Sequence, residues 1–401
     1  MHEAARAAEQ AARTSYGRLV AILAGRTCDL AAVEDALAEA FGAALATWPA
    51  RGVPDRPEAW LLTAARRVLG HGQRHARVRA AAAQALHLLA EEAEDRMTTA
   101  SPFPDERLGL LFVCAHPAID RSVHTPLMLQ TVLGLDAARI AGAFATTAAA
   151  MGQRLVRAKA KIRDAGIAFA VPGADQLAER LDPVLEAIYA AYGTGWDAPD
   201  GRDLTAEALF LCRLTADLLP GEPEVLGLLA LLLHCEARSG ARRGAGGAFV
   251  PLAAQDTALW DRGMIAAAEQ TLGRAFALRR IGHFQIEAAI QSAHAGRAAT
   301  GRVDWAGIVR LYDALIGLAP GLGALVGRAA ALAEAGEAQV GLAALEAIAG
   351  ADGYQPWWAV RAHLLQLLGR TAEAAAAYAR AGSLASDPAV REFLRARAAD
   401  A

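Results

Sequence analysis

Two short segments of the chain carry cations with no acid among them, a composition that suits the binding of phosphate. The first lies between Glu58 and Glu91, and the second runs from Gln153 to Arg163 and holds both lysines of the chain. Arginine and lysine bind the phosphates of nucleic acids, and arginine also reads base edges. Two such runs in a chain of formal net charge −3 predict two places where a polyanion docks.

The second cationic run falls at the end of a predicted helix–turn–helix. Asp136 is expected to cap a short helix that runs through Phe144, and Thr147 to cap a longer helix that runs to Arg163. Both are residue types whose side chains accept hydrogen bonds from the free N–H groups of a first helical turn.

Two faces of that longer helix differ in chemistry. Spacings of 3 and 4 place one set of apolar residues and one set of cations on separate faces. The apolar set is Met151, Leu155 and Ala158, and the cationic stripe is Arg154, Arg157 and Lys161. An apolar seam that fixes the helix, beside a cationic edge that meets DNA, is typical of a recognition helix.

The first cationic run follows a predicted bundle of helices near the N-terminus. Helices are expected over residues 14–23 and 30–48, with Asp29 as the N-cap of the second, and from Glu58 onward. The second helix has an apolar face made of Val33, Leu37, Phe41 and Ala44. Its other face carries Glu34, Asp35 and Glu39, three acids that suit a basic partner.

Composition excludes several classes of protein. Of the residues, 54% are hydrophobic and many of these are alanine, so we expect an all-α fold and no disordered chain. The longest apolar stretch, Val225–Leu233, is too short to span a membrane, and the N-terminus has no signal-peptide pattern, so we expect a cytoplasmic protein with no membrane partner. Four scattered cysteines without a CxxC pair predict no metal site and no cofactor.

Charge and repeats indicate four parts along the chain. Residues 1–167 have a net charge of +3 and the remainder −6. We expect a helical domain over 1–80, a linker over 81–104, a helix–turn–helix domain over 105–170 and a helical extension over 174–401. In the extension, Ala335-Gly336 and Leu368-Gly369 stand 33 residues apart between Ala/Leu-rich helices, a period typical of tetratricopeptide (TPR) repeats.

Several motifs together resemble the extracytoplasmic-function (ECF) sigma factors of bacterial RNA polymerase. The segments that resemble sigma region 2 are SYGRLV (15–20), VEDALAEAF (33–41), TWP (47–49) and PEAWLLTAARR (57–67). Those that resemble region 4 are RL (107–108) through CAHPA (114–118), and MGQRLVRAK (151–159). The C-terminal part is similar to the TPR-like extension of the DUF6596-type subgroup, through LPGEPEVLGLLA (219–230), QD (255–256), WD (260–261), DW (304–305) and LYD (311–313).

The resemblance implies a role for each set of charged residues. It implies a sigma region 2 bundle that binds core RNA polymerase at the β′ coiled coil and holds the opened −10 element, and a region 4 that binds the β flap and the −35 element. The expected polymerase contacts are Glu34, Asp35 and Glu39. The expected −10 contacts are Arg66, Arg67, Arg74 and Arg77. The expected −35 contacts are Thr147, Gln153, Arg154, Arg157, Lys159 and Lys161.

The resemblance has departures, and other functions compete with it. Ala38 stands where the family often has an amide, and His71, flanked by two glycines, replaces a usual aspartate. A stand-alone helix–turn–helix regulator with a TPR-like sensor domain is an alternative that needs no polymerase. An enzyme is not expected, because His234, His283, His294 and His363 are scattered and no HExxH or GxSxG motif occurs. The extension is expected to bind a regulatory protein or to cover the cationic helices.

Overall fold

The computed structural model describes residues 2–25, 27, 29–76, 105–144, 146–165, 172, 174–198 and 201–401. In these ranges every regular element is a helix, and a single isolated bridge joins Arg243 to Phe249. An all-α fold is therefore confirmed. The chain forms two compact units, Met1–Thr194 and Gly195–Ala401.

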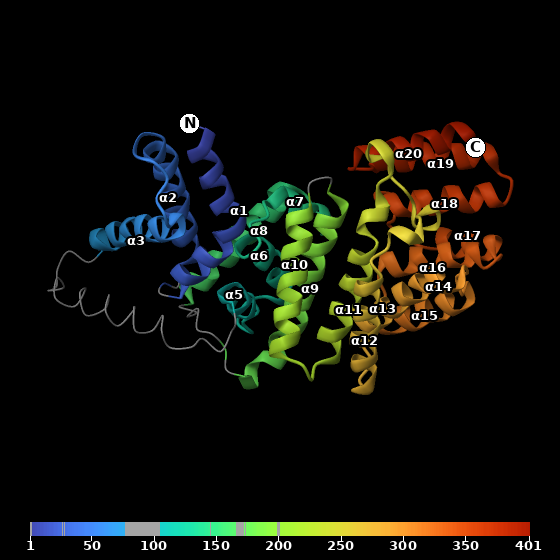
Figure 1. The fold of residues 1–401 in the computed structure, drawn as a ribbon, viewed down its shortest axis with the longest axis horizontal. Coiled ribbons are helices and arrows are strands. Elements are labelled where there is room, and N and C mark those ends of the chain that lie inside the picture. Colours follow the sequence, from blue (N-terminus) through green and yellow to red (C-terminus); the bar gives the residue numbers. More distant parts are fainter. Residues whose placement is uncertain are drawn as a thin grey trace. The chain divides into compact units, whose positions relative to one another are not determined.

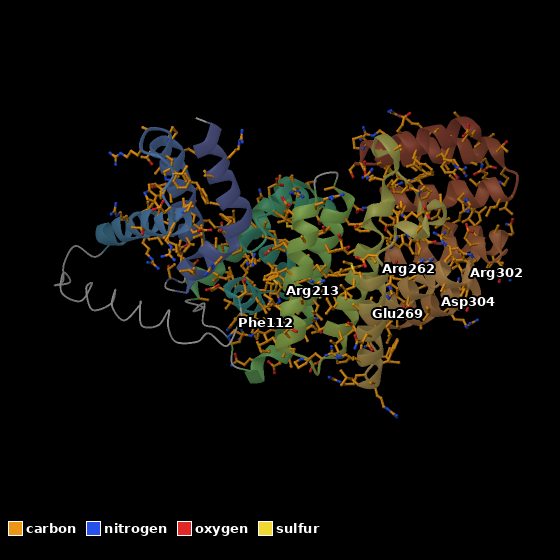
Figure 2. The ribbon with its side chains drawn as sticks, viewed as in Figure 1. Phe112, Arg213, Arg262, Glu269, Arg302 and Asp304 are labelled. Carbon is orange, nitrogen blue, oxygen red and sulfur yellow. The ribbon has the colours of Figure 1, made fainter. Side chains whose placement is uncertain are left out.

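The first unit contains α3 and α8, the helices that carry the described residues of the two cationic runs (Figure 1). Its core includes Phe112, which is fully buried on α5 and is labelled in Figure 2. Its helices are α1 (His2–Ala24), α2 (Leu30–Arg51), α3 (Pro57–Ala76), α5 (Glu106–Cys114), α6 (Arg121–Thr131), α7 (Ala137–Ala143), α8 (Ala148–Asp164) and α9 (Ala174–Asp197), the last of which continues three residues past the unit's end.

The ends of two early helices differ from the sequence prediction. Helix α1 begins at His2, twelve residues before the predicted start at Thr14. Helix α2 does not stop at Pro49 but continues to Arg51, where Gly52 ends it with φ +81° and an N–H bond to the Trp48 carbonyl at 2.9 Å. A glycine at positive φ is the usual way to end a helix, whereas the proline only removes one donor in the last turn.

The described parts of both predicted N-terminal domains belong to the first compact unit. The segments 1–76 and 105–165 lie in one unit, in which α1 contacts α5 and α2 contacts α8. The predicted start of the extension at residue 174 coincides with the start of α9, but most of α9 belongs to the first unit. Residues 81–104, the predicted linker, lie outside the described residues.

The second unit is a succession of helices that pack on their neighbours in the chain (Figure 1). Its α-helices are α10 (Arg202–Leu218), α11 (Pro223–Ala237), α12 (Arg262–Ala277), α13 (His283–Ala295), α14 (Arg297–Thr300), α15 (Trp305–Leu318), α16 (Leu322–Glu334), α17 (Ala338–Glu346), α18 (Gln355–Leu367), α19 (Thr371–Leu384) and α20 (Pro388–Asp400). Four 3₁₀ turns lie between α11 and α12: η1 (Ser239–Arg242), η2 (Ala245–Gly247), η3 (Leu252–Ala254) and η4 (Thr257–Leu259).

Helix α11 contains the longest apolar stretch of the chain and is buried by its neighbours. It packs against α12 and α13, and almost every residue from Pro223 to His234 is buried. At its closest approach to α13, a Cβ on Gly227 would come within 2.7 Å of the Gln285 backbone nitrogen, so a larger residue there would separate the two helices. No helix in the described part of the chain has the length and apolar character to cross a bilayer.

The repeat predicted around Gly336 and Gly369 corresponds to a repeated helix ending. Both glycines follow a helix with positive φ, +88° and +72°, and both precede another helix. The following N–H group, of Glu337 or Arg370, bonds to the carbonyl five residues earlier at 2.9 Å in both cases. This is the six-to-one bond of a Schellman ending, so α16–α17 and α18–α19 are joined in the same way.

A glycine-to-alanine change tests this ending. Gly369→Ala puts a Cβ in the left-handed region, and we expect it to lower the free energy of unfolding of the second unit by about 1–2 kcal/mol. Gly353→Ala is the matched control, since Gly353 has neither a positive φ nor an atom within 4 Å of its added Cβ. Urea unfolding followed by circular dichroism measures both variants, and equal midpoints would contradict the argument.

Candidate nucleic-acid interface

Helix α8 is positioned by its cap and by one buried face. Thr147 Oγ1 accepts a hydrogen bond from the Ala150 N–H at 3.2 Å, and Asp136 caps α7 in the same way through the Arg139 N–H at 2.8 Å. Both caps confirm the prediction. The apolar seam is also confirmed, because the side chains that the pattern assigned to it are buried: Met151, Leu155 and Ala158, joined by Ile162.

The cationic stripe of α8 reaches solvent beside this seam. Arg157 and Lys161 are exposed, and Arg157 donates to the Gln153 carbonyl one turn earlier, at 3.3 Å. Arg154 is half-buried, and its Nη2 donates to the Ser122 carbonyl at 2.6 Å, which ties α8 to the start of α6. Three cations along one edge of a capped helix suit contact with the phosphates and base edges of a duplex.

An exposed acid lies close to the stripe. The hydrogen bond from Ser122 to the Asp120 carboxylate, helped by the positive charges of Lys161 and Arg154, holds the pKa of Asp120 below its ordinary value. Asp120 also caps α6 by accepting from the Ser122 N–H at 2.9 Å. The carboxylate therefore stays ionised at neutral pH and offsets part of the stripe's positive charge.

The environment of Lys159 differs from the one that the sequence predicted. The sequence predicted a phosphate contact, but the structure buries Lys159 and pairs its Nζ with Glu34 Oε2 on α2. Lys159 lies next to the apolar seam of α8 and away from the stripe of Arg154, Arg157 and Lys161. Its charge is therefore not available to DNA in this structure, and Glu34 is not available to an outside partner.

The other two acids of α2 remain on the surface. Asp35 and Glu39 are exposed, while Val33, Leu37 and Ala44 of the predicted apolar face are buried. The fourth residue of that face, Phe41, is half-buried. Two of the three predicted acids of α2 therefore lie on the surface.

The predicted −10 contacts lie on α3 as far as the structure describes them. Arg66 and Arg67 are exposed, and Leu61 and Ala65 are buried on the other side of the helix. Arg74 lies on α3, but its side chain falls outside the described residues, as does the whole of Arg77.

Trp60 is half-buried and packs in the N-terminal bundle. Its ring meets that of Trp48 edge to face, with centroids 5.5 Å apart. An edge-to-face aromatic pair of this kind stabilises the contact between α2 and α3. A packing role for Trp60 therefore accords with its surroundings.

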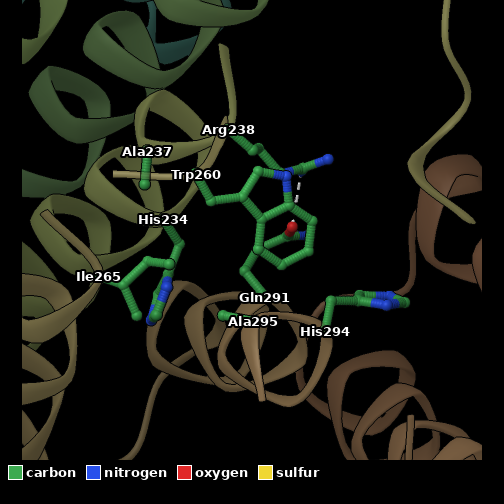
Figure 3. A pocket seen from close by; sticks show the side chains of 8 residues that line it. All are labelled: His234, Ala237, Arg238, Trp260, Ile265, Gln291, His294 and Ala295. Carbon is green, nitrogen blue, oxygen red and sulfur yellow. Dashed lines mark hydrogen bonds between the residues drawn. The ribbon is translucent and has the colours of Figure 1, made fainter. Parts of the chain in front are cut away.

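The second unit holds a small, partly open cavity (Figure 3). Its volume is about 10 Å³, which suits a single water molecule. Trp260 stands between His234 and His294, and Arg238 donates to Gln291 at 2.7 Å. No spacing pattern in the sequence connects the two histidines, because the helices that bring them together, α11 and α13, are far apart in the chain.

The four histidines of the second unit that the sequence singled out each contact a neighbour. His234, His283 and His363 lie 3.5, 3.3 and 2.8 Å from the carboxylates of Glu269, Glu224 and Glu334. His294 meets the ring of Trp305 edge to face. Among the described residues no group of three or more His, Cys, Asp or Glu side chains has the geometry to hold a metal ion.

Comparisons with known proteins place the chain in a family. Residues 180–276 match a family of unknown function (DUF6596). An uncharacterized protein of Rhizobium meliloti (strain 1021) is 38% identical over 382 residues, which cover 92% of this chain and 89% of the relative. The chain therefore belongs to the same protein family as this relative. No solved structure matches it.

The family match covers the first three motifs of the C-terminal resemblance, at 219–230, 255–256 and 260–261. It confirms the DUF6596 segment, and that segment contains five of the residues that line the cavity: His234, Ala237, Arg238, Trp260 and Ile265.

His234, which is buried, and His294, which is half-buried, predict a loss of stability in acid. Burial lowers the pKa of both His234 and His294 to about 4, from an ordinary value of 6.5. Between these values the unfolded chain binds protons that the folded chain does not, so stability is full above pH 6.5 and falls as the pH drops toward 4. Each histidine contributes up to about 3 kcal/mol to this loss.

Thermal unfolding at pH 7 and pH 5 measures this effect. We expect the melting temperature of the second unit to fall at pH 5 in the wild type, and to fall less in His234→Gln/His294→Gln. His363→Gln is the control, since His363 lies on the surface with a third of its side chain exposed. An equal acid shift in all three proteins would show that His234 and His294 do not cause it.

Proposed function

We propose that this chain is an alternative sigma factor of the ECF type, which binds core RNA polymerase and directs initiation at specific promoters. The observation that carries the proposal is α8, a capped helix with a buried seam and an exposed cationic stripe at the end of a helix–turn–helix. The stripe suits the major groove at the −35 element, where Arg154 and Arg157 would contact base edges or phosphates and Lys161 would contact phosphate. Thr147 and Gln153 are exposed at the start of the same helix.

The N-terminal bundle supplies the other two contacts in this proposal. Asp35 and Glu39 on α2 are exposed acids for a basic surface of the polymerase, the β′ coiled coil. Arg66 and Arg67 on α3 are exposed cations for the backbone of an opened −10 strand. Holding a melted strand costs a few kcal/mol of unstacking, and such cations offset part of that cost.

The second unit acts as a TPR-like regulatory extension in this proposal. The equivalent helix endings at Gly336 and Gly369 support a repeat of helical hairpins, an architecture that presents extended surfaces to peptides and protein domains. A regulatory protein bound there would control the two DNA-binding segments of the first unit.

Run-off transcription tests the proposal. The purified full chain is mixed with bacterial core polymerase and a library of promoter fragments, and the 5′ ends of the transcripts are mapped. We expect transcripts with defined starts that depend on the chain. The absence of any such transcript, with a chain that still binds duplex DNA, would overturn the sigma-factor assignment.

Removing two cations of the stripe separates DNA binding from polymerase binding. We expect Arg154→Ala/Arg157→Ala to weaken binding to its promoter duplex at least about tenfold, because each base-edge contact contributes roughly 1–3 kcal/mol. Binding to core polymerase should not change. Fluorescence anisotropy with duplex and gel filtration with polymerase measure the two affinities.

Arg163→Ala is the matched control for this pair. Arg163 is also an exposed arginine of α8, but it lies opposite the stripe and pairs with Asp164 at 3.1 Å. The Arg163→Ala variant should bind the duplex nearly as tightly as the wild type. Loss of polymerase binding in Arg154→Ala/Arg157→Ala would contradict the assignment of the stripe to DNA.

One observation favours a second function, a stand-alone DNA-binding regulator. Glu34, a predicted polymerase contact, is already occupied by Lys159. A regulator that never meets polymerase has no need of a free acid at that position. Co-elution of the chain with core polymerase at low salt discriminates between the two, since the regulator predicts no complex.

A further inference from the structure

The cavity of the second unit has a wall rich in hydrogen-bond donors (Figure 3). We propose that it is a binding site for a monatomic anion, chloride or a heavier halide, which ties α11 to α13. The inference concerns the second unit alone and does not depend on the sigma assignment. Helix α11 supplies His234 and Arg238 to the wall, α13 supplies Gln291 and His294, and Trp260 comes from the connection that ends just before α12.

The indole N–H of Trp260 is a buried donor that none of the described residues accepts. Trp260 is only 4% exposed, and its Nε1 atom has no hydrogen-bond partner among the described residues. An indole N–H can only donate, so this atom requires an acceptor. A buried donor without an acceptor is costly, and a ligand that accepts from it recovers that cost. The cavity that Trp260 lines is the place for such a ligand.

His234 brings a second buried donor to the wall. It is 3% exposed, and neither of its ring nitrogens makes a hydrogen bond to the described residues. The Glu269 carboxylate lies 3.5 Å from Nε2 and already accepts from Ser292 Oγ at 2.6 Å. Burial lowers the pKa of His234 to about 4, so its ring is neutral at pH 7 and keeps one N–H to donate.

The charge on the wall is positive. Among the described residues that line the cavity, Arg238 is charged and none is acidic. Arg238 donates through Nη2, to Gln291 Oε1 at 2.7 Å and to Cys235 Sγ at 3.7 Å, and its guanidinium has two further nitrogens that carry hydrogen. A second guanidinium, of Arg297, lies over the Trp260 ring, 5.1 Å from its centroid. Donors next to positive charge favour an anion.

The size of the cavity and its hydrogen-bond balance select a halide. The volume of about 10 Å³ admits one atom of about the size of a water molecule, so phosphate, sulfate and carboxylates are too large to enter it whole. A water molecule also has two hydrogens to donate, whereas the amide oxygen on the wall, Gln291 Oε1, already accepts from Arg238. A halide only accepts, and this matches the donors of Trp260, His234 and Arg238.

A bound halide would join three parts of the chain: α11, the connection that ends at Trp260, and α13. Two hydrogen bonds already link these parts. Arg238 donates to Gln291, and the Asp261 N–H donates to the Ala237 carbonyl at 2.8 Å. The halide adds hydrogen bonds to a charged acceptor, which are the stronger kind, so the second unit should be more stable when it is bound.

Acid should strengthen the binding. Burial and the charge of Arg238 lower the pKa of His234 and of His294; Arg297 adds to this at His294, and Glu269 opposes it at His234. A negative ion in the cavity favours the protonated form of both rings. Because the complex then binds protons more readily than the free protein, its affinity for halide rises as the pH falls.

Trp260→Phe is the variant that tests the site, because it keeps an aromatic ring in the wall and removes the N–H. Thermal unfolding of the full chain is followed by circular dichroism while chloride or bromide replaces gluconate at constant ionic strength. In the wild type we expect the melting temperature of the second unit to rise with halide. Trp260→Phe should need at least about tenfold more halide for the same rise, the effect of one lost hydrogen bond to a charged group.

Trp358→Phe is the matched control. Trp358 Nε1 donates to the Asp352 carbonyl at 2.9 Å, and Trp358 does not line the cavity. This variant also loses an indole hydrogen bond, but its dependence on halide should equal that of the wild type. An equal dependence in the wild type and in Trp260→Phe would contradict the site.

The pH dependence gives a second measurement. Half of the full effect should need about threefold less halide at pH 5 than at pH 7 in the wild type. In His234→Gln/His294→Gln the two pH values should give the same halide requirement. A wild type with equal requirements at both pH values would show that the ion does not lie beside these histidines.

Bromide in crystals of the full chain gives a result that depends on no variant. We expect an anomalous peak in the cavity, within hydrogen-bond distance of Trp260 Nε1. Water density there without a bromide peak would overturn the proposal and assign the cavity to a structural water. Equal melting temperatures of the wild type in gluconate and in halide would overturn it as well.

Discussion

The packing of α8 against its neighbours is the constraint on which the first unit depends. Four apolar side chains along one face of the helix are buried, and this orientation decides where every charged residue of α8 points. Arg157 and Lys161 are carried outward, Arg154 is turned toward the start of α6, and Lys159 is carried inward. One helix thus presents cations to solvent and contributes another to the interior.

The buried position of Lys159 is stable only because its ammonium group pairs with a carboxylate. Lys159 and Glu34 come from helices more than a hundred residues apart, and neither would remain buried as an isolated charge. The same contact brings α1 so close to the end of α6 that glycine is required at position 17. The ion pair and the glycine stabilise the same interface in different ways. The pair compensates two buried charges, and the glycine avoids a steric clash. This is why the two can be changed independently.

The second unit is organised by local rules repeated along the chain. Glycines in the left-handed conformation end α16 and α18 with the same backbone bonds, and aspartates cap α12, α15 and α20. Asp304, labelled in Figure 2, accepts from the Gly307 N–H at 2.8 Å and so begins α15. The segment that matches the family model contains α11, whose apolar residues are covered by α12 and α13. His234 and His294 lie beside Trp260 where α11 packs against α13.

Local sequence determined the helices, their caps and their apolar faces. Asp29, Asp136 and Thr147 cap the predicted helices, because capping depends only on a side chain and the next three residues. The position of Lys159 was decided by tertiary structure alone. Spacing along α8 shows that it borders the apolar seam, but the acid that pairs with it lies on another helix, and no local pattern connects the two. The cavity beside Trp260 depends in the same way on the packing of α11 against α13. Charge pairing across distant helices depends on how they pack, and that packing is a property of the whole unit.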